Sequence, residues 1–260
     1  LGNVNRIGYQ AFASCEQLVS INLPDSITNI DEEAFSWCSS LTLKGLPNRL
    51  KKLGYSALDG VKIRYLHIPA SLEEIGEAFA GRFHKNNVES ITVNPSNNAF
   101  IVKEGMLMSK DGTKLYLYPS KSKQSGCHIP PGVERIAESA FLGAAFLKQI
   151  TIPDSVAQIG ERAFEQCSLL ERIVIPDKVL VVPSFGFYRC LNLTEVQLPA
   201  TLRSIGGNSF QECVALRHIN IPDTVTLIDT WAFTGAGLVS LRIPIGIRKV
   251  NDQIAIHHSI

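Results

Sequence analysis

The strongest constraint on this chain is a period of 23 residues within its own sequence. Phenylalanines and prolines both recur at this step, at Phe141, Phe164, Phe187, Phe210 and Phe233, and at Pro130, Pro153, Pro176, Pro199 and Pro222. A repeat of this length is a supersecondary unit that cannot bury its apolar face alone, so neighbouring repeats must stack into a solenoid. Such a chain offers an extended surface more readily than one enclosed pocket.

Each repeat carries the same internal pattern of apolar positions. Apolar and polar residues alternate around Ile21 and Leu23, which predicts a short half-buried strand there. Pro24 has no N–H and ends this strand. The apolar positions that follow fall three and four residues apart, which predicts a 3₁₀ or short α-helical limb. The sequence therefore predicts an α/β leucine-rich-repeat solenoid, with one short parallel strand and one helical limb in each repeat of about 23 residues.

The stretch from Leu147 to Cys167 carries the pattern L-x-x-I-x-I-P-x-x-V-x-x-I-G-x-x-A-F-x-x-C without a gap, and it recurs over nearly the whole chain. This pattern resembles the BspA-like leucine-rich repeats. Members of that family are mostly bacterial and protozoan surface proteins that act in adhesion and protein binding. The resemblance implies a non-enzymatic module at the cell surface or secreted, with a protein partner such as a host or matrix protein. A cytoplasmic protein-interaction scaffold is the alternative.

The period weakens in the first half of the chain. Lys44 and Gly45 replace the usual apolar and polar strand positions, and Pro69 is followed by Pro95 after 26 residues. We expect the corresponding turns of the solenoid, called rungs below, to be looser. The stretch 100–118 predicts a β-hairpin with its turn at Asp111 and Gly112, which serves as a specialised rung.

One domain is expected over residues 1–260, with an irregular part at about 80–128 inside it. No run approaches the roughly 18 consecutive apolar residues of a membrane span, so no membrane insertion is expected in this segment. The chain has 25 lysine and arginine residues and 24 acidic residues. It therefore lacks the large positive charge that is typical of a dedicated nucleic-acid binder.

The basic residues are nevertheless unevenly distributed. One basic window contains Lys44, Arg49, Lys51, Lys52, Lys62 and Arg64. A solvated face is the ordinary interpretation of such a window. A site for an acidic partner or a sulfated glycan is the alternative.

Five cysteines occupy one repeat position, the third after the phenylalanine position: Cys15, Cys38, Cys167, Cys190 and Cys213. Metal sites are typically announced by close pairs such as C-x-x-C, and disulfide frameworks by varied spacing. Because alanine fills the same position in other repeats, we expect a column of buried, reduced thiols. Cys127 is out of phase and is the one candidate reactive thiol.

No catalytic, metal-binding or cofactor-binding motif stands out. The spacings of nucleophile elbows, of phosphate-binding loops and of zinc-binding H-E-x-x-H are absent. His67 and His218 fall at polar strand positions, where a solvent-facing histidine is the ordinary interpretation. Glu73, Glu74 and Glu77 are expected to be solvated charges. The sequence therefore predicts a protein that is not an enzyme and has no cofactor.

Alternate strand side chains must point outward, and the equivalent positions stack from rung to rung. The candidate binding residues on this outward face are Gln149, Thr151, Arg172, Glu195, Gln197, Arg217, His218 and Asn220. The face has no tryptophan or tyrosine in these rungs, so binding is expected to be modest per site and to gain from multivalency. The alternative surface is the hairpin, with Met106, Met108, Tyr116 and Tyr118.

Overall fold

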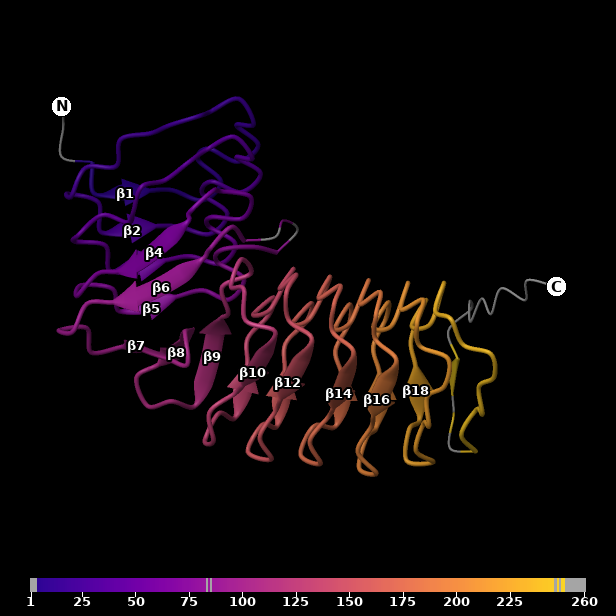
Figure 1. Cartoon of the computed structure of the whole chain (residues 1–260). Coiled ribbons are helices and arrows are strands. Elements are labelled where there is room, and N and C mark those ends of the chain that lie inside the picture. Colours follow the sequence, from indigo (N-terminus) through magenta and orange to yellow (C-terminus); the bar gives the residue numbers. More distant parts are fainter. Residues whose placement is uncertain (1–3, 83, 85, 246, 248, 251–260) are drawn as a thin grey trace. The chain divides into compact units, whose positions relative to one another are not determined.

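The structure, a computed structural model, describes residues 4–82, 84, 86–245, 247 and 249–250 (Figure 1). The chain divides into two compact units, Leu1–Ser122 and Lys123–Ile260, which are called unit 1 and unit 2. Each unit is described by itself. The expectation of a single domain over 1–260 therefore stays a prediction.

The rungs of unit 2 are joined by a parallel ladder of short strands, called the main ladder. It consists of β10 (Gly126–His128), β12 (Gln149–Thr151), β14 (Arg172–Val174) and β16 (Glu195–Gln197). Gln149 pairs with Arg172, and Arg172 pairs with Glu195, so the register advances by one repeat per strand. Figure 1 shows these strands side by side. Ile173 and Val196 point inward and are buried, as the alternation predicts.

Every regular rung also has a second short strand, which the repeat pattern did not predict. In unit 2 these strands are β11 (Arg135–Ile136), β13 (Gln158–Ile159), β15 (Val181–Val182), β17 (Ser204–Ile205), β18 (Leu227–Ile228) and β19 (Lys249–Val250). The residue after the strand donates its N–H to the previous rung, as from Gly160 to the Ile136 carbonyl at 2.8 Å. Pro183 holds this position after β15 and has no N–H. In agreement, β13 and β15 belong to separate sheets.

The predicted helical limb is wrong, because the structure contains no helix among the residues it describes. The limb is a series of tight turns in which every fourth residue has a positive φ, as at Arg162 (56°) and Gln166 (57°). A left-handed residue ends a right-handed helix before it can begin. Apolar spacing of three and four residues fits such turns as well as a helix. The fold is therefore an all-β leucine-rich-repeat solenoid and not an α/β one.

Hydrogen bonds between rungs stabilise this strained limb. Ala163 N–H donates within its own turn to Gly160, whereas Arg162 and Phe164 donate to carbonyls of the next rung, at 3.1 and 2.9 Å. A left-handed conformation is uncommon for residues other than glycine. The limb adopts it because alternate N–H groups then point at the neighbouring rung and are satisfied there.

The phenylalanine column forms the centre of the core in unit 2. Consecutive rings are stacked, with centroids 5.1 to 5.4 Å apart, from Phe141 through Phe164, Phe187 and Phe210 to Phe233. Phe164, Phe187 and Phe210 are fully buried. The 23-residue period is thus the spacing at which one ring lies on the next.

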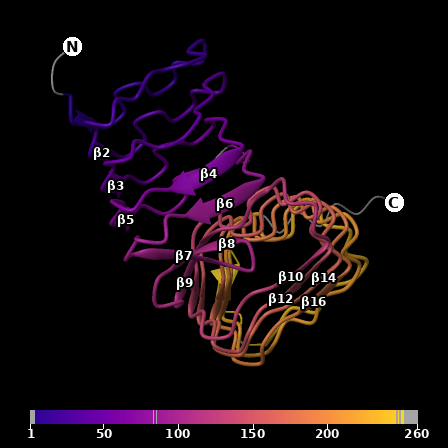
Figure 2. The ribbon, with the colours of Figure 1, turned by 60° about the vertical axis from the view of Figure 1, so that its left-hand side comes forward.

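Unit 1 keeps the second ladder and loses part of the main one. The second ladder is continuous through β1 (Arg6–Ile7), β2 (Asn29–Ile30), β3 (Lys52–Leu53) and β5 (Glu74–Ile75). The main strands that the structure describes here form only one two-stranded sheet, β4 (Tyr65–Ile68) with β6 (Ser90–Val93), which lie side by side in Figure 2. Toward the first rungs a single bridge, Thr42 with Lys62, remains. Less strand pairing is found around Lys44 and Gly45, as expected, but the strand predicted around Ile21 and Leu23 is wrong, because that regular segment also forms no strand.

The predicted hairpin is part of a three-stranded antiparallel meander. Its strands are β7 (Phe100–Lys103), β8 (Met106–Ser109) and β9 (Lys114–Leu117). The second turn contains Asp111 and Gly112, as predicted. The first turn, at Glu104 (φ 50°) and Gly105 (φ 75°), was missed. Two consecutive positive φ angles belong to the type I′ turn that matches the twist of a hairpin.

A buried asparagine attaches this meander to the preceding rung. The Asn97 side chain donates to the carbonyls of Pro69 and Leu72 at 2.7 and 2.9 Å. Its Oδ1 accepts the N–H groups of Ala99 and Phe100, both at 2.8 Å. Asn97 therefore uses its whole hydrogen-bonding capacity where the repeat pattern is interrupted.

Candidate functional site

The outward face of the main ladder in unit 2 is where the structure places the predicted binding residues. All eight of them are exposed: Gln149, Thr151, Arg172, Glu195, Gln197, Arg217, His218 and Asn220. The first five belong to β12, β14 and β16, and the last three continue the same alternation in an extended segment of the next rung. We call this surface the strand face.

Ionic contacts on the strand face run from rung to rung. Arg172 Nη2 lies 3.2 Å from a Glu195 carboxylate oxygen. Beyond the main ladder, Arg242 contacts both oxygens of Asp223, a turn residue, at 2.7 and 2.9 Å. The Arg172 and Glu195 side chains are 58% and 59% exposed, so their pairing adds little to the free energy of unfolding. Both side chains can exchange this contact for one with a partner.

One apolar side chain interrupts the polar columns of the strand face. Val174 pairs in register with Gln197 and is 49% exposed. A half-exposed valine within a polar surface is a small anchor that a partner can cover.

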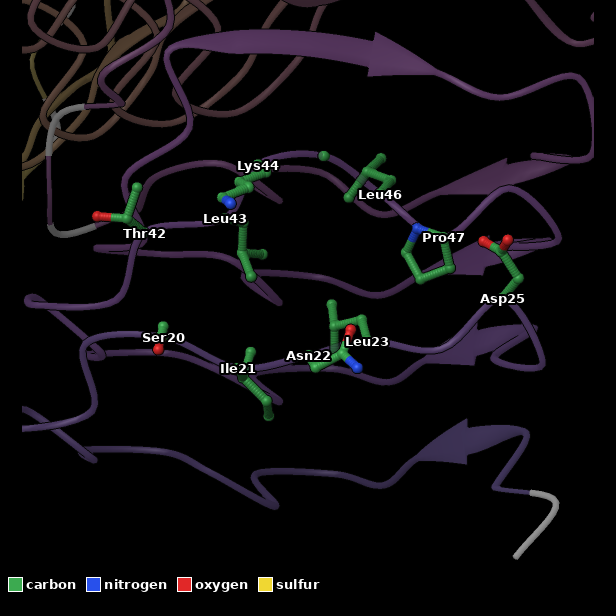
Figure 3. A pocket seen from close by; sticks show the side chains of 11 residues that line it. Ser20, Ile21, Asn22, Leu23, Asp25, Thr42, Leu43, Lys44, Leu46 and Pro47 are labelled. Carbon is green, nitrogen blue, oxygen red and sulfur yellow. The ribbon is translucent and has the colours of Figure 1, made fainter. Parts of the chain in front are cut away.

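A groove between two rungs of unit 1 is the second candidate binding surface. It lies between the segments Ser20–Asp25 and Thr42–Pro47 and has a volume of about 560 Å³ (Figure 3). Its rim includes Lys44 and Gly45, the residues that break the repeat pattern. The sequence predicted loosening here but not a groove, because the pattern does not tell how far two rungs separate.

The six cysteines, all within the described residues, form no disulfide. Cys38, Cys167, Cys190 and Cys213 are fully buried, and each thiol donates to the carbonyl of the phenylalanine-position residue one rung earlier, at 2.9 to 3.2 Å. Burial raises the pKa of the Cys190 thiol well above its ordinary value and that of Cys213 to about 12. These four thiols are therefore structural and unreactive.

Two of the cysteine predictions need correction. Cys15 is exposed, so the expected burial of all five column thiols is wrong at this position. Cys127 is buried in β10, where it pairs with Ile150 and occupies an inward strand position. Its place out of phase with the other cysteines is that of a core residue, not of an exposed nucleophile.

The histidine and glutamates noted in the sequence make separate contacts and do not form a common site. His67 is exposed, and its Nδ1 lies 2.9 Å from the Thr92 hydroxyl. Glu73 and Glu74 pair with Lys51 and Lys52 on the second ladder of unit 1. In the described part of the chain, no three His, Cys, Asp or Glu side chains are grouped to hold a metal. Over the same residues there is no helix long and apolar enough for a membrane crossing.

The hairpin offers less surface than its composition suggests. Met106, Met108 and Tyr118 are buried in the core. Tyr116 is half-buried, packs edge-on against Phe100 with centroids 5.5 Å apart, and has the Lys114 ammonium 4.7 Å from its ring centroid. These side chains stabilise the meander, which favours the strand face as the binding surface.

Comparisons with known proteins agree with this geometry. The sequence profile of the BspA type leucine rich repeat region matches six copies, over residues 3–105 and 115–239. No curated protein matches the chain.

Two solved structures have a closely similar fold. A leucine rich cell surface protein from Faecalibacterium prausnitzii is 28% identical, with a TM-score of 0.78 over 95% of this chain and 69% of that one. A leucine-rich repeat protein from Eubacterium ventriosum is 21% identical, with a TM-score of 0.74 over 95% and 78%. The pneumococcal vaccine antigen PcpA is more distant, at 18% identity and a TM-score of 0.56 over 92% of this chain and 85% of that one.

Proposed function

Because the chain belongs to the BspA type leucine-rich-repeat family, we propose that it is a non-enzymatic module that binds a protein partner through its strand face. Leucine-rich-repeat proteins generally bind proteins, and the family and fold are generally non-enzymatic. The observation that carries the proposal is the unbroken register of the main ladder in unit 2, from Gly126 through Gln149 and Arg172 to Glu195.

This register turns a polar pattern in the sequence into one surface. Parallel strands hold equivalent side chains in columns, so Arg172, Glu195 and Gln197 lie on neighbouring rungs with fixed spacing. A rigid surface loses little conformational entropy on binding. Its contacts are mostly polar with Val174 as an apolar anchor, which fits modest affinity per site and gain through several copies.

A cell-surface or secreted location with a host or matrix protein as partner is part of the proposal. The similar protein from Faecalibacterium prausnitzii is described as a cell surface protein. The buried thiol column, which suggested a cytoplasmic scaffold, does not favour that alternative. Each column thiol from Cys38 onward is buried and donates to a carbonyl, so it is protected from oxidation in either compartment.

The test is a solid-phase binding and cell-adhesion assay with a panel of purified extracellular-matrix proteins. The variant Arg172→Glu with Arg217→Glu reverses two charges of the strand face, and we expect it to reduce binding at least tenfold. Lys178→Glu with Arg203→Glu is the matched control, since both residues are exposed in unit 2 outside the strand face. Equal loss in both double variants, or binding unaffected by the first, would contradict the proposed surface.

A further inference from the structure

The groove in unit 1 is bounded on two sides by backbone. The segment Ser20–Asp25 forms one wall and Thr42–Pro47 the other, and Figure 3 shows the labelled side chains of both walls around the space between them. Its volume, about 560 Å³, is in the range of ligand clefts, roughly 300–1,000 Å³. In unit 2 the equivalent segments pair as β10, β12, β14 and β16.

Few backbone hydrogen bonds join the two walls of the groove. One backbone hydrogen bond, from Thr42 N–H to the Val19 carbonyl at 3.0 Å, joins the two walls. Leu43 N–H instead donates to the Lys62 carbonyl of the following rung, also at 3.0 Å. Among the described residues, neither Ile21–Leu23 nor Lys44–Leu46 belongs to a strand ladder.

Backbone N–H and C=O groups outside any ladder can pair with another extended chain. A peptide can add main-chain hydrogen bonds to such groups, while its alternate side chains contact the surface on either side. Gly45 favours this approach, because a Cβ placed there would have no heavy atom within 4 Å. The backbone at Gly45 is therefore accessible from the groove.

The charged residues near the groove favour a peptide with acidic side chains. Lys44 lies on the rim, and Lys62 lies directly across the bridge from Thr42. No described acid pairs with either lysine, whereas Lys51 and Lys52 are neutralised by Glu73 and Glu74. Lys44 on the rim and Lys62 in the rung behind this wall are two uncompensated cations, which attract an acidic segment.

A single carboxylate lines the groove. Asp25 accepts hydrogen bonds from the Asn48 N–H at 3.0 Å and from the Asn48 side chain at 3.4 Å, so its charge is partly satisfied by the wall itself. Asp25 lies at the end of the wall beside Pro47 (Figure 3). The acidic peptide can thus approach from the side of Lys44.

We propose that this groove is a second binding site, which takes an extended acidic segment of a partner protein. The peptide main chain pairs with the edges of Ile21–Leu23 and Lys44–Leu46, and its carboxylates contact Lys44 and Lys62. The site is separate from the strand face and does not depend on the function proposed for that face.

The probe is a fluorescein-labelled peptide of three Glu-Val units, with both ends blocked, titrated against the whole chain by fluorescence anisotropy. We expect saturable binding, which Lys44→Glu with Lys62→Glu weakens at least tenfold. Lys51→Glu with Lys52→Glu has the same change in charge on the second ladder and is expected to change affinity by less than twofold. Absence of binding up to about 1 mM peptide, or equal effects of both double variants, would overturn the proposal.

Two further measurements separate backbone pairing from simple charge attraction. The same peptide methylated on alternate backbone nitrogens keeps its charge and loses donors, so its binding should fall at least tenfold; equal binding would overturn the pairing. Gly45→Phe places a ring in the groove from a position where an added Cβ has no heavy atom within 4 Å. It should abolish peptide binding without lowering the unfolding midpoint, and peptide binding retained in this variant would place the peptide elsewhere.

Discussion

The main strands of unit 1 and unit 2 come from the same repeat and behave differently. In unit 2, β10, β12, β14 and β16 pair in sequence without interruption. In unit 1, the first rungs share one isolated bridge, and β4 pairs only with β6 among the described strands. The second ladder of unit 1 is nevertheless continuous from β1 to β5. The main-strand segments of neighbouring rungs can therefore stay unpaired while the second strands of the same rungs remain paired.

The stability of the stacked rungs should depend on the buried side chains and much less on the exposed ones. Removing a buried phenylalanine costs about 3–5 kcal/mol. Phe187→Ala should therefore lower the free energy of unfolding of unit 2 by that amount, because the ring is stacked between Phe164 and Phe210. Arg172→Ala, on the exposed strand face, should cost less than about 1 kcal/mol. Chemical denaturation of both variants is the measurement, and similar midpoints would contradict the assignment of inward and outward positions.

Glycine substitutions test how closely neighbouring rungs pack in the two units. A Cβ at Gly160 would lie 2.4 Å from the Glu138 nitrogen of the previous rung, whereas a Cβ at Gly45 meets nothing within 4 Å. Gly160→Val should cost about 1–3 kcal/mol or more through overpacking. Gly45→Val should stay within about 0.5 kcal/mol of the natural chain. Thermal unfolding of the two variants is the measurement. A loss of stability in Gly45→Val as large as that in Gly160→Val would mean that the neighbouring rung packs against Gly45 and that the groove is closed.

The thiol column should make the stability of unit 2 depend on alkaline pH. Burial raises the folded pKa of Cys213 from 9.0 to about 12, so the folded chain keeps a proton that the unfolded chain releases. The contribution is fully present below pH 9.0 and is lost as the pH rises from there toward 12. Unfolding titrations from about pH 8 to about pH 10.5 should show this decline, and Cys213→Ala should reduce it. A decline of the same size in the variant would exclude Cys213 as its source.

Thiol labelling extends the same comparison to unit 1. Cys15 is exposed, whereas Cys190 is buried and its pKa is raised by burial. Cys15 should react with an alkylating reagent in the folded chain, and Cys190 only after unfolding. Peptide mapping by mass spectrometry measures both rates. Equal rates at the two positions would contradict the burial of the column.

Much of the fold could be predicted from the sequence, and the rest could not for physical reasons. The 23-residue step predicts the stacking of Phe164 on Phe187, and Asp111 with Gly112 predicts a turn. The limb was misassigned because turns with a left-handed residue, as at Arg162, place apolar side chains at the spacing of a helix. The second strands are only two residues long in each regular rung, too short for an alternating pattern.

The strand face could be predicted from the sequence, whereas the groove could not. The strand face follows from alternation alone, so the sequence is enough to place Arg172 and Glu195 on it. The groove depends on the distance between two rungs, which Lys44 and Gly45 do not encode by themselves. The exposure of Cys15 and the burial of Met106 likewise depend on neighbours that a repeat pattern does not specify.

Site-resolved amide hydrogen exchange tests the contrast between the two main ladders most directly. The N–H groups of Thr194 and Ile175 donate to carbonyls of neighbouring rungs at 2.9 Å in unit 2, so they should be protected by several orders of magnitude. The amides of Gly45 and Leu46, outside any described ladder, should exchange at nearly the rate of an unstructured chain. Protection of Gly45 and Leu46 equal to that of Thr194 and Ile175 would show a closed ladder in unit 1 and contradict the open groove.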